Sequence, residues 1–153
     1  MKNSIQDIRL DFSDLMEAFA RGEGLSPNSG RILGYLLMSE DPVPFSELAQ
    51  ELDISRGGIS ENTRVLEDHG IIERHRASGD RRDHFRIRED ASEALEERRR
   101  ERARENLRRL MNFRSNWVLS PEQEDRVSGL QSHLETLTNT PSKANGPDKD
   151  HEE

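Results

Sequence analysis

Arginine is the residue type with the most evident chemistry in this chain, because eight arginines lie between residues 54 and 88 beside six acidic residues. A guanidinium group is always charged, and its planar set of donors fits a phosphate group or the edge of a guanine base. This stretch sums to +2, whereas the whole chain carries a net charge of −8. A locally positive face on an acidic body favours a partner rich in phosphate.

The elements that position these arginines are predicted to be two helices followed by a hairpin. Phe45, Leu48 and Leu52 have the spacing of a short helix, and Ser55 is placed as the cap of a second helix. Two short strands follow, joined by a turn at residues 77–82. This order allows one helix to enter a groove of duplex DNA while the hairpin reaches the backbone beside it.

The second helix is predicted to present one face to the protein core and the other to DNA. Ile59, Thr63 and Leu66 form the inner face. We expect the DNA contacts to come from the opposite face and from the hairpin tip: Ser55, Arg56, Gly57, Ser60, Glu61, Asn62, Arg64, Arg81 and Arg82. Asp80 and Asp83 are expected to support the tip by pairing with its arginines.

Two adjacent glycines, Gly57 and Gly58, lie in the first turn of this helix. Each costs roughly 1 kcal/mol relative to alanine inside a helix, so a compensating use is expected. One interpretation is that the bare helix start approaches a phosphate group closely. The other is that packing leaves no room for a side chain at one of the two positions.

Apolar stripes near both ends of the chain predict contacts with a second subunit. Only 31% of residues are hydrophobic, so the core is thin or completed by a partner. The stripes have 3-4-3 spacing, typical of one narrow helix face. Their residues are Ile5, Ile8, Phe12, Leu15, Phe19, Val127, Leu130, Leu134 and Leu137. We therefore predict a homodimer.

These signals predict a mainly α-helical fold with a small β-hairpin wing, an α+β winged helix-turn-helix with N- and C-terminal dimerisation helices. Residues 1–22 are assigned to the first dimerisation helix and residues 25–89 to the DNA-binding domain. Residues 90–138 are assigned to a connector and the C-terminal dimerisation helix, and residues 139–153 to a disordered tail. Acidic residues alternate with the connector's arginines, which favours a solvated helix over a second DNA contact.

Several classes of protein are disfavoured by composition. The chain has no cysteine, no apolar run near the ~18 residues of a membrane span and no leader-like N-terminus. Its five histidines lack metal-ligand spacing, and the sequence has no nucleophile-elbow or phosphate-loop motif. We expect a cytoplasmic protein that is not an enzyme, with no cofactor, metal or membrane partner. The excess of 20 arginines over three lysines is compatible with a GC-rich genome or a high-salt cytoplasm.

A winged helix that binds another protein is the alternative to a DNA-binding protein. In that case the terminal apolar stripes form the protein interface. The placement of arginines at both groove-facing positions favours DNA instead.

The central stretch also resembles a known family. Its order of elements is similar to the winged helix-turn-helix of MarR-type regulators, most closely the GbsR-like branch. The matching segments are GLSPNSGRILGYLL (Gly24–Leu37), SRGGIS (Ser55–Ser60), LEDHGII (Leu66–Ile72) and GDRRDHF (Gly79–Phe85). The resemblance covers roughly residues 5–115. It implies a homodimer that presents a helix and a wing from each subunit to a near-palindromic operator.

The same resemblance implies control by a small-molecule effector. For the GbsR-like branch this suggests a quaternary ammonium compound, which aromatic faces bind well. The candidate aromatic residues are Phe19, Tyr35, Phe113 and Trp117. A role for these residues in the core, an effector of another class, or no effector at all are open alternatives.

Overall fold

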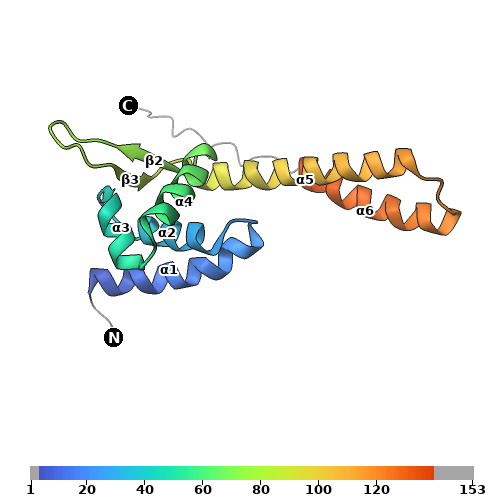
Figure 1. Cartoon of the computed structure of the whole chain (residues 1–153). Helices are drawn as coiled ribbons and strands as arrows, with labels where there is room; N and C mark the ends of the chain where they lie inside the picture. The colour runs from blue at the N-terminus through green and yellow to red at the C-terminus, as the bar shows by residue number, and fades with distance from the viewer. Residues whose placement is uncertain (1–3, 140–153) are drawn as a thin grey trace, which may run out of the picture. The chain divides into compact units, whose positions relative to one another are not determined.

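A computed structural model describes residues 4–139, which divide into two compact units with a boundary between Leu95 and Glu96 (Figure 1). The chain is mostly helical with a small antiparallel sheet, so the predicted fold class is confirmed. The elements are α1 (Ile5–Gly22), α2 (Pro27–Leu37), β1 (Val43–Pro44), α3 (Phe45–Leu52), α4 (Arg56–Asp68), β2 (Ile72–His75), β3 (His84–Ile87), α5 (Ala91–Asn116) and α6 (Pro121–Asn139). The predicted tail, apart from Asn139, lies outside the described residues.

Serine caps fix the starts of four helices. The hydroxyls of Ser4, Ser26 and Ser55 each accept a hydrogen bond of 3.0 Å from the amide three residues further on. At the start of α6, Gln123 Oε1 accepts from the Ser120 amide while Ser120 Oγ accepts from the Gln123 amide. This reciprocal pair is a capping box, as the sequence indicates.

Helices α1 and α2 pack closely because two glycines of α2 face α1. A Cβ added to Gly30 would lie 2.3 Å from the carbonyl oxygen of Met16, and one added to Gly34 would lie 2.7 Å from that of Phe12. No side chain fits at such distances, so the bare backbone of α2 lies directly against α1. The first helix is therefore part of the same unit as the helix-turn-helix.

The small sheet has the strand order β1-β3-β2, and both strand pairs are antiparallel. In its register Val43 lies opposite Phe85, and His75 lies opposite His84. The sequence does not predict the strand β1, because a strand of two residues is too short to show the alternation typical of strands. It leads directly into α3, whose cap is Pro44.

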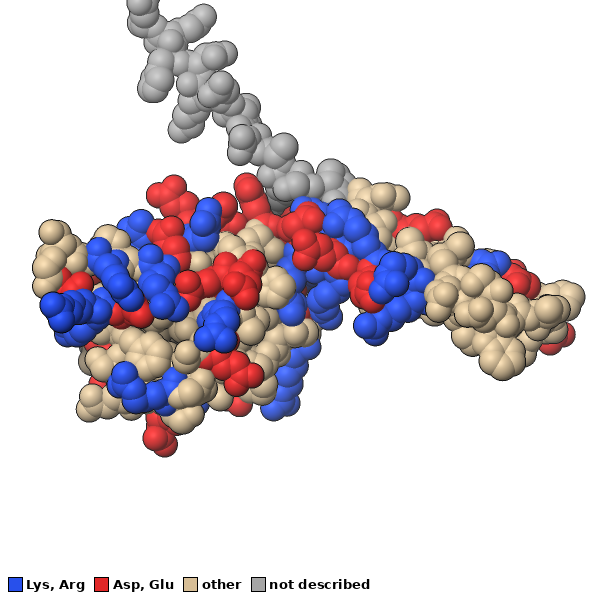
Figure 2. All heavy atoms as spheres, turned by 45° about the horizontal axis from the view of Figure 1, so that its top comes forward, with Lys and Arg blue, Asp and Glu red and all other residues tan. Residues whose placement is uncertain are grey.

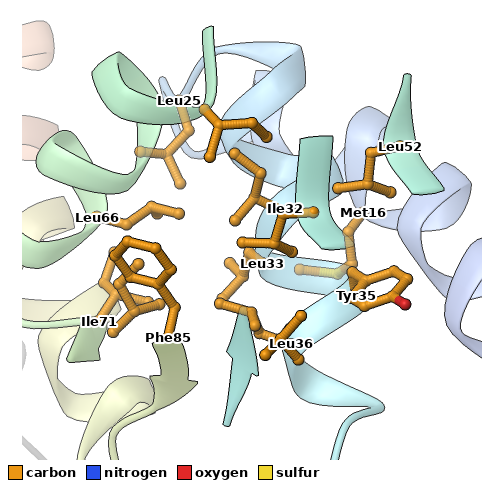
Figure 3. Packing of buried hydrophobic residues seen from close by; sticks show 14 of the residues in the cluster. Met16, Leu25, Ile32, Leu33, Tyr35, Leu36, Leu52, Leu66, Ile71 and Phe85 are labelled. Atoms are coloured by element: carbon orange, nitrogen blue, oxygen red, sulfur yellow. The ribbon is translucent and has the colours of Figure 1, made fainter. Parts of the chain in front are cut away.

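One apolar core holds the first unit together (Figure 3). Its largest fully buried side chains, Tyr35 and Phe85, come from α2 and β3. Leu52 of α3 and Leu66 of α4 are also fully buried, so both helices of the helix-turn-helix are anchored on α2 and the hairpin. This core holds α4 and the hairpin in a defined relation within the unit.

In the second unit, ion pairs run along the arginine-rich part of α5. Glu97 pairs with Arg100 and Arg104, and Glu105 pairs with Arg108 and Arg109. Hydrogen bonds from these arginines hold the pKa of each glutamate below its usual value. Pairs of this kind support a helix whose surface faces solvent.

Between residues 4 and 139, no helix has the length and apolarity needed to cross a membrane.

Candidate nucleic-acid interface

Helix α4 has the two faces that the sequence predicts, with one exception described below. Ile59, Thr63 and Leu66 are fully buried. The opposite face is exposed at Arg56, Gly57, Glu61 and Arg64 and half-buried at Ser60. This outer face is a mixed set of charged and hydroxyl groups, which suits hydrogen bonding to base edges and phosphates.

The two glycines at the start of α4 differ in their surroundings. A Cβ on Gly58 would lie 2.8 Å from Cγ2 of Ile54, so packing excludes a side chain there. A Cβ on Gly57 would have nothing within 4 Å. Packing thus accounts for Gly58 alone, and Gly57 leaves the start of α4 bare on its outer face.

Asn62 is the exception, because its side chain is turned into the domain. It is 8% exposed, and its Oδ1 accepts hydrogen bonds from the hydroxyls of Ser26 and Ser29 on α2. Its Nδ2 donates to the carbonyl oxygen of Gly58 at 2.7 Å. The expectation that Asn62 contacts bases is therefore corrected, since its amide is already committed to partners within the domain.

At the tip of the hairpin, Asp80 holds Arg82. The Asp80 carboxylate accepts from Nε and Nη2 of Arg82 at 2.9 to 3.2 Å and from the Arg82 amide at 2.9 Å. These bonds lower the pKa of Asp80 from 3.8 to about 2, so it stays charged at any ordinary pH. Asp80 thus pairs with Arg82 at the tip of the hairpin.

Asp83 supports the strands of the hairpin instead of its tip. Its carboxylate accepts from Arg76 at 2.7 Å and from Arg74 at 3.0 Å, both on the β2 side of the hairpin. Arg74 also pairs with Glu67 of α4 at 3.0 Å. The expected pairing of Asp83 with Arg81 or Arg82 is wrong, and Asp83 links the hairpin to α4 through Arg74.

Five of the eight arginines between residues 54 and 88 are ion-paired, and three are not. The paired ones are Arg74, Arg76, Arg82, Arg86 and Arg88. Within the described part of the chain, Arg56, Arg64 and Arg81 have no acidic partner and are exposed. The Arg56 guanidinium lies over the ring of Phe45, 4.9 Å from its centre.

Figure 2 shows the same alternation over the end of the first unit that holds the hairpin, where arginine and acidic side chains interleave. Most of the positive charge between residues 54 and 88 is therefore neutralised by acidic residues of the same chain. The three unpaired arginines lie on α4 and at the hairpin tip, the two places expected to meet DNA.

Comparisons with known proteins show the family of this chain. Residues 23–83, from the end of α1 to the hairpin tip, match the sequence profile of the MarR family. The HTH-type transcriptional regulator MmpR5 of Mycobacterium tuberculosis is 36% identical over 140 residues, which are 90% of this chain and 84% of the relative. The chain belongs to the MarR family. A crystal structure described as a transcriptional regulator is 32% identical, with a TM-score of 0.69 over 86% of this chain and 90% of that one. The GbsR-like branch stays a prediction.

The aromatic residues considered for an effector site of this MarR-family chain lie in different settings. Tyr35 is fully buried, with Arg9 5.5 Å from its ring centre and its hydroxyl 3.3 Å from both Gln6 Oε1 and Glu47 Oε2. Burial raises the pKa of this hydroxyl. Because Arg9 covers the ring, Tyr35 is not available as the wall of a cation cage, which corrects that expectation. Phe19 is 42% exposed on α1.

The other two aromatic candidates lie in the second unit. Phe113 and Trp117 stack with ring centres 6.3 Å apart at the end of α5, and they are 46% and 65% exposed. They are thus an exposed pair at the end of α5, with Trp117 directly after the last residue of the helix.

Proposed function

We propose that this MarR-family protein is a transcriptional regulator that binds duplex DNA as a homodimer. In this proposal α4 enters the major groove and the hairpin tip lies at the adjacent minor groove. The supporting observation is the division of arginines, in which Arg56, Arg64 and Arg81 are the exposed members without an acidic partner. Their charge is available to phosphates without breaking an existing ion pair.

The outer face of α4 is proposed to read base edges. Arg64 has the reach and donor geometry for a guanine, and Ser60 and Glu61 provide a hydroxyl and a carboxylate beside it. Gly57 allows the start of the helix to approach a phosphate, because nothing occupies the space where its side chain would be. Ser55 and Arg56 flank that approach.

The hairpin tip is proposed to place two arginines differently. Arg81 is free to enter a narrow minor groove, where a weakly hydrated guanidinium is favoured. Arg82 is held by Asp80, so it can contact a phosphate only with its remaining donors or by leaving Asp80. We therefore assign the larger contribution at the tip to Arg81.

Exposed apolar side chains on the single chain support the proposed homodimer. On α1, Ile5, Ile8 and Leu15 are 56%, 53% and 61% exposed. On α6, Leu130 is 51% exposed. Residues of the predicted stripes thus remain uncovered, as expected of a surface that a second copy buries. A two-fold dimer presents two copies of α4 and so favours a near-palindromic operator.

We propose no role for Tyr35 in a quaternary ammonium cage, because this residue lies buried beneath Arg9. The described residues favour no class of effector.

A direct test is the affinity of the purified protein for a fluorescent random-sequence duplex at increasing salt. Binding through several phosphates weakens steeply between 50 and 200 mM salt, by about 10³-fold or more for six contacts. The rival interpretation, a winged helix that binds protein, predicts no retention of the duplex at either salt concentration. That result would reject DNA binding.

A further inference from the structure

A partly buried polar cluster links helix α4 to the start of α2. Asn62, which is 8% exposed, accepts from the hydroxyls of Ser26 and Ser29, the latter at 2.9 Å. Ser29 is 1% exposed. Ser26 Oγ also accepts from the Ser29 amide, so the group that caps α2 is the group that holds Asn62. The amide nitrogen of Asn62 is occupied by the Gly58 carbonyl.

We propose that Asn62 is a positioning residue that sets the rotation of α4 and thereby the sequence specificity of the protein. The inference rests on the proposed DNA-binding function and goes beyond it. It assigns specificity to a residue that touches no base, through the serines at the start of α2.

The chemistry of the cluster explains why a polar residue is used at this position. Apolar packing of α4 through Ile59 and Leu66 holds the helix against the core, but it is non-directional and defines the rotation of the helix less sharply than hydrogen bonds do. Hydrogen bonds are directional, and breaking a buried one leaves its partners unsatisfied. Oδ1 of Asn62 has two donors on α2, so a rotation of α4 would strain both bonds at once. The bond from Nδ2 to the Gly58 carbonyl lies within α4 and orients the amide toward α2.

The geometry of a helix shows why a small rotation matters. Side chains extend about 5–6 Å from the helix axis, so a turn of about 20° moves their ends by about 2 Å. A hydrogen bond to a base edge does not tolerate such a shift. Flexible arginine side chains can still follow the phosphates, so non-specific affinity is affected much less than specificity.

The decisive variant is Asn62→Leu, which keeps the approximate volume and removes all three bonds. Its affinity is measured for a duplex carrying the motif selected by the wild type and for a scrambled duplex, each at two salt concentrations. We expect the ratio of the two affinities to fall at least tenfold. The affinity for the scrambled duplex and its salt dependence are expected to stay near the wild-type values.

Thr63→Val is the matched control. Thr63 is also buried, but its hydroxyl donates only within α4, to Ile59 at 2.7 Å and Ser60 at 3.3 Å. Removing this hydroxyl alters stability without touching the link to α2, so the ratio should be unchanged. Ser29→Ala removes one donor from the α2 side, and in the Asn62→Leu background it should have no further effect on the ratio.

A folded Asn62→Leu variant that keeps the wild-type ratio would overturn the proposal. An equal loss of the ratio in Thr63→Val would also overturn it, because the effect would then belong to stability alone. If Asn62→Leu does not fold by circular dichroism, Ser29→Ala decides, with a reduced ratio expected and an unchanged one contradicting the inference. Failure of the proposed DNA-binding function would give a different result, because the wild-type protein itself would then select no motif.

Discussion

The salt dependence of DNA binding should distinguish the free arginine at the hairpin tip from a paired one. Arg81 is exposed without an acidic partner in the described chain, whereas Arg86, on β3 of the same hairpin, pairs with Glu73. Both Arg81→Gln and Arg86→Gln remove one positive charge. Only the first removes a guanidinium that we expect to contact DNA.

The expected magnitude follows from the release of counterions. Each neutralised phosphate contributes about 0.9 to the slope of log K against log salt. A guanidinium in the minor groove lies between the two phosphate backbones, so we count Arg81 as neutralising one phosphate, and a dimer loses two when Arg81 is replaced. The slope should therefore become shallower by about 1.8 units. Expressed as affinity, the advantage of the wild type over Arg81→Gln should be about 12-fold larger at 50 mM than at 200 mM salt.

Fluorescence anisotropy with one labelled duplex at four or more salt concentrations measures both slopes. Arg86→Gln should keep the slope of the wild type to within about half a unit, because its charge is already neutralised by Glu73. Equal slopes for wild type and Arg81→Gln would refute the assignment of the tip. An equal loss in both variants would show that overall charge, not contact, sets the salt dependence.

Four further substitutions test the glycines and the tip carboxylate. Gly57→Ala should increase the free energy of unfolding by up to about 1 kcal/mol, seen as a higher thermal midpoint, because open space surrounds this position in the free protein. The same substitution should lower DNA affinity, because the added methyl group would lie between the helix start and the phosphate. Gly30→Ala should lower the free energy of unfolding, measured with urea, by about 1–3 kcal/mol, because the added Cβ would lie 2.3 Å from the Met16 carbonyl oxygen. Gly129→Ala is the control: nothing lies within 4 Å of the added Cβ, so this variant should stabilise α6 slightly. Hydrogen bonds from Arg82 lower the pKa of Asp80 from 3.8 to about 2, so this ion pair stabilises the hairpin above pH 3.8 and is lost as pH falls toward 2. The difference in thermal midpoint between wild type and Asp80→Asn should therefore shrink as the pH falls from 4 toward 2, and no change over that range would contradict the pairing.

Local signals in the sequence predicted the elements of the fold because their causes are local. Ser4, Ser26 and Ser55 cap helices through bonds that span three residues, and Gly30 and Gly34 expose the backbone of α2 at helical spacing. The alternation of acidic residues and arginines in α5 likewise indicated a solvated helix. Each of these features can be found without knowing the tertiary structure.

The role of Asn62 could not be predicted in the same way. The residue lies at the border between the two faces of α4, where helical periodicity places a polar side chain equally well in solvent or in the core. Its burial depends on Ser26 and Ser29, which precede it by 36 and 33 residues. Only the packing of α2 against α4 brings these hydroxyls to the amide.

Tyr35 and Asp83 show the same limit. An aromatic residue in an apolar helix is compatible with a cage or with the core, and the position of Arg9 over the ring decides for the core. The choice of Asp83 among several nearby arginines follows from the register of β2 and β3, which sequence spacing alone does not specify.

The most direct test of the central claim is selection from a random duplex library by the purified protein, followed by sequencing of the retained DNA. We predict a motif with two-fold symmetry whose half-sites lie about one helical turn, 10–10.5 base pairs, apart. Retention of DNA without any motif, or no retention at low salt, would contradict a sequence-specific dimer.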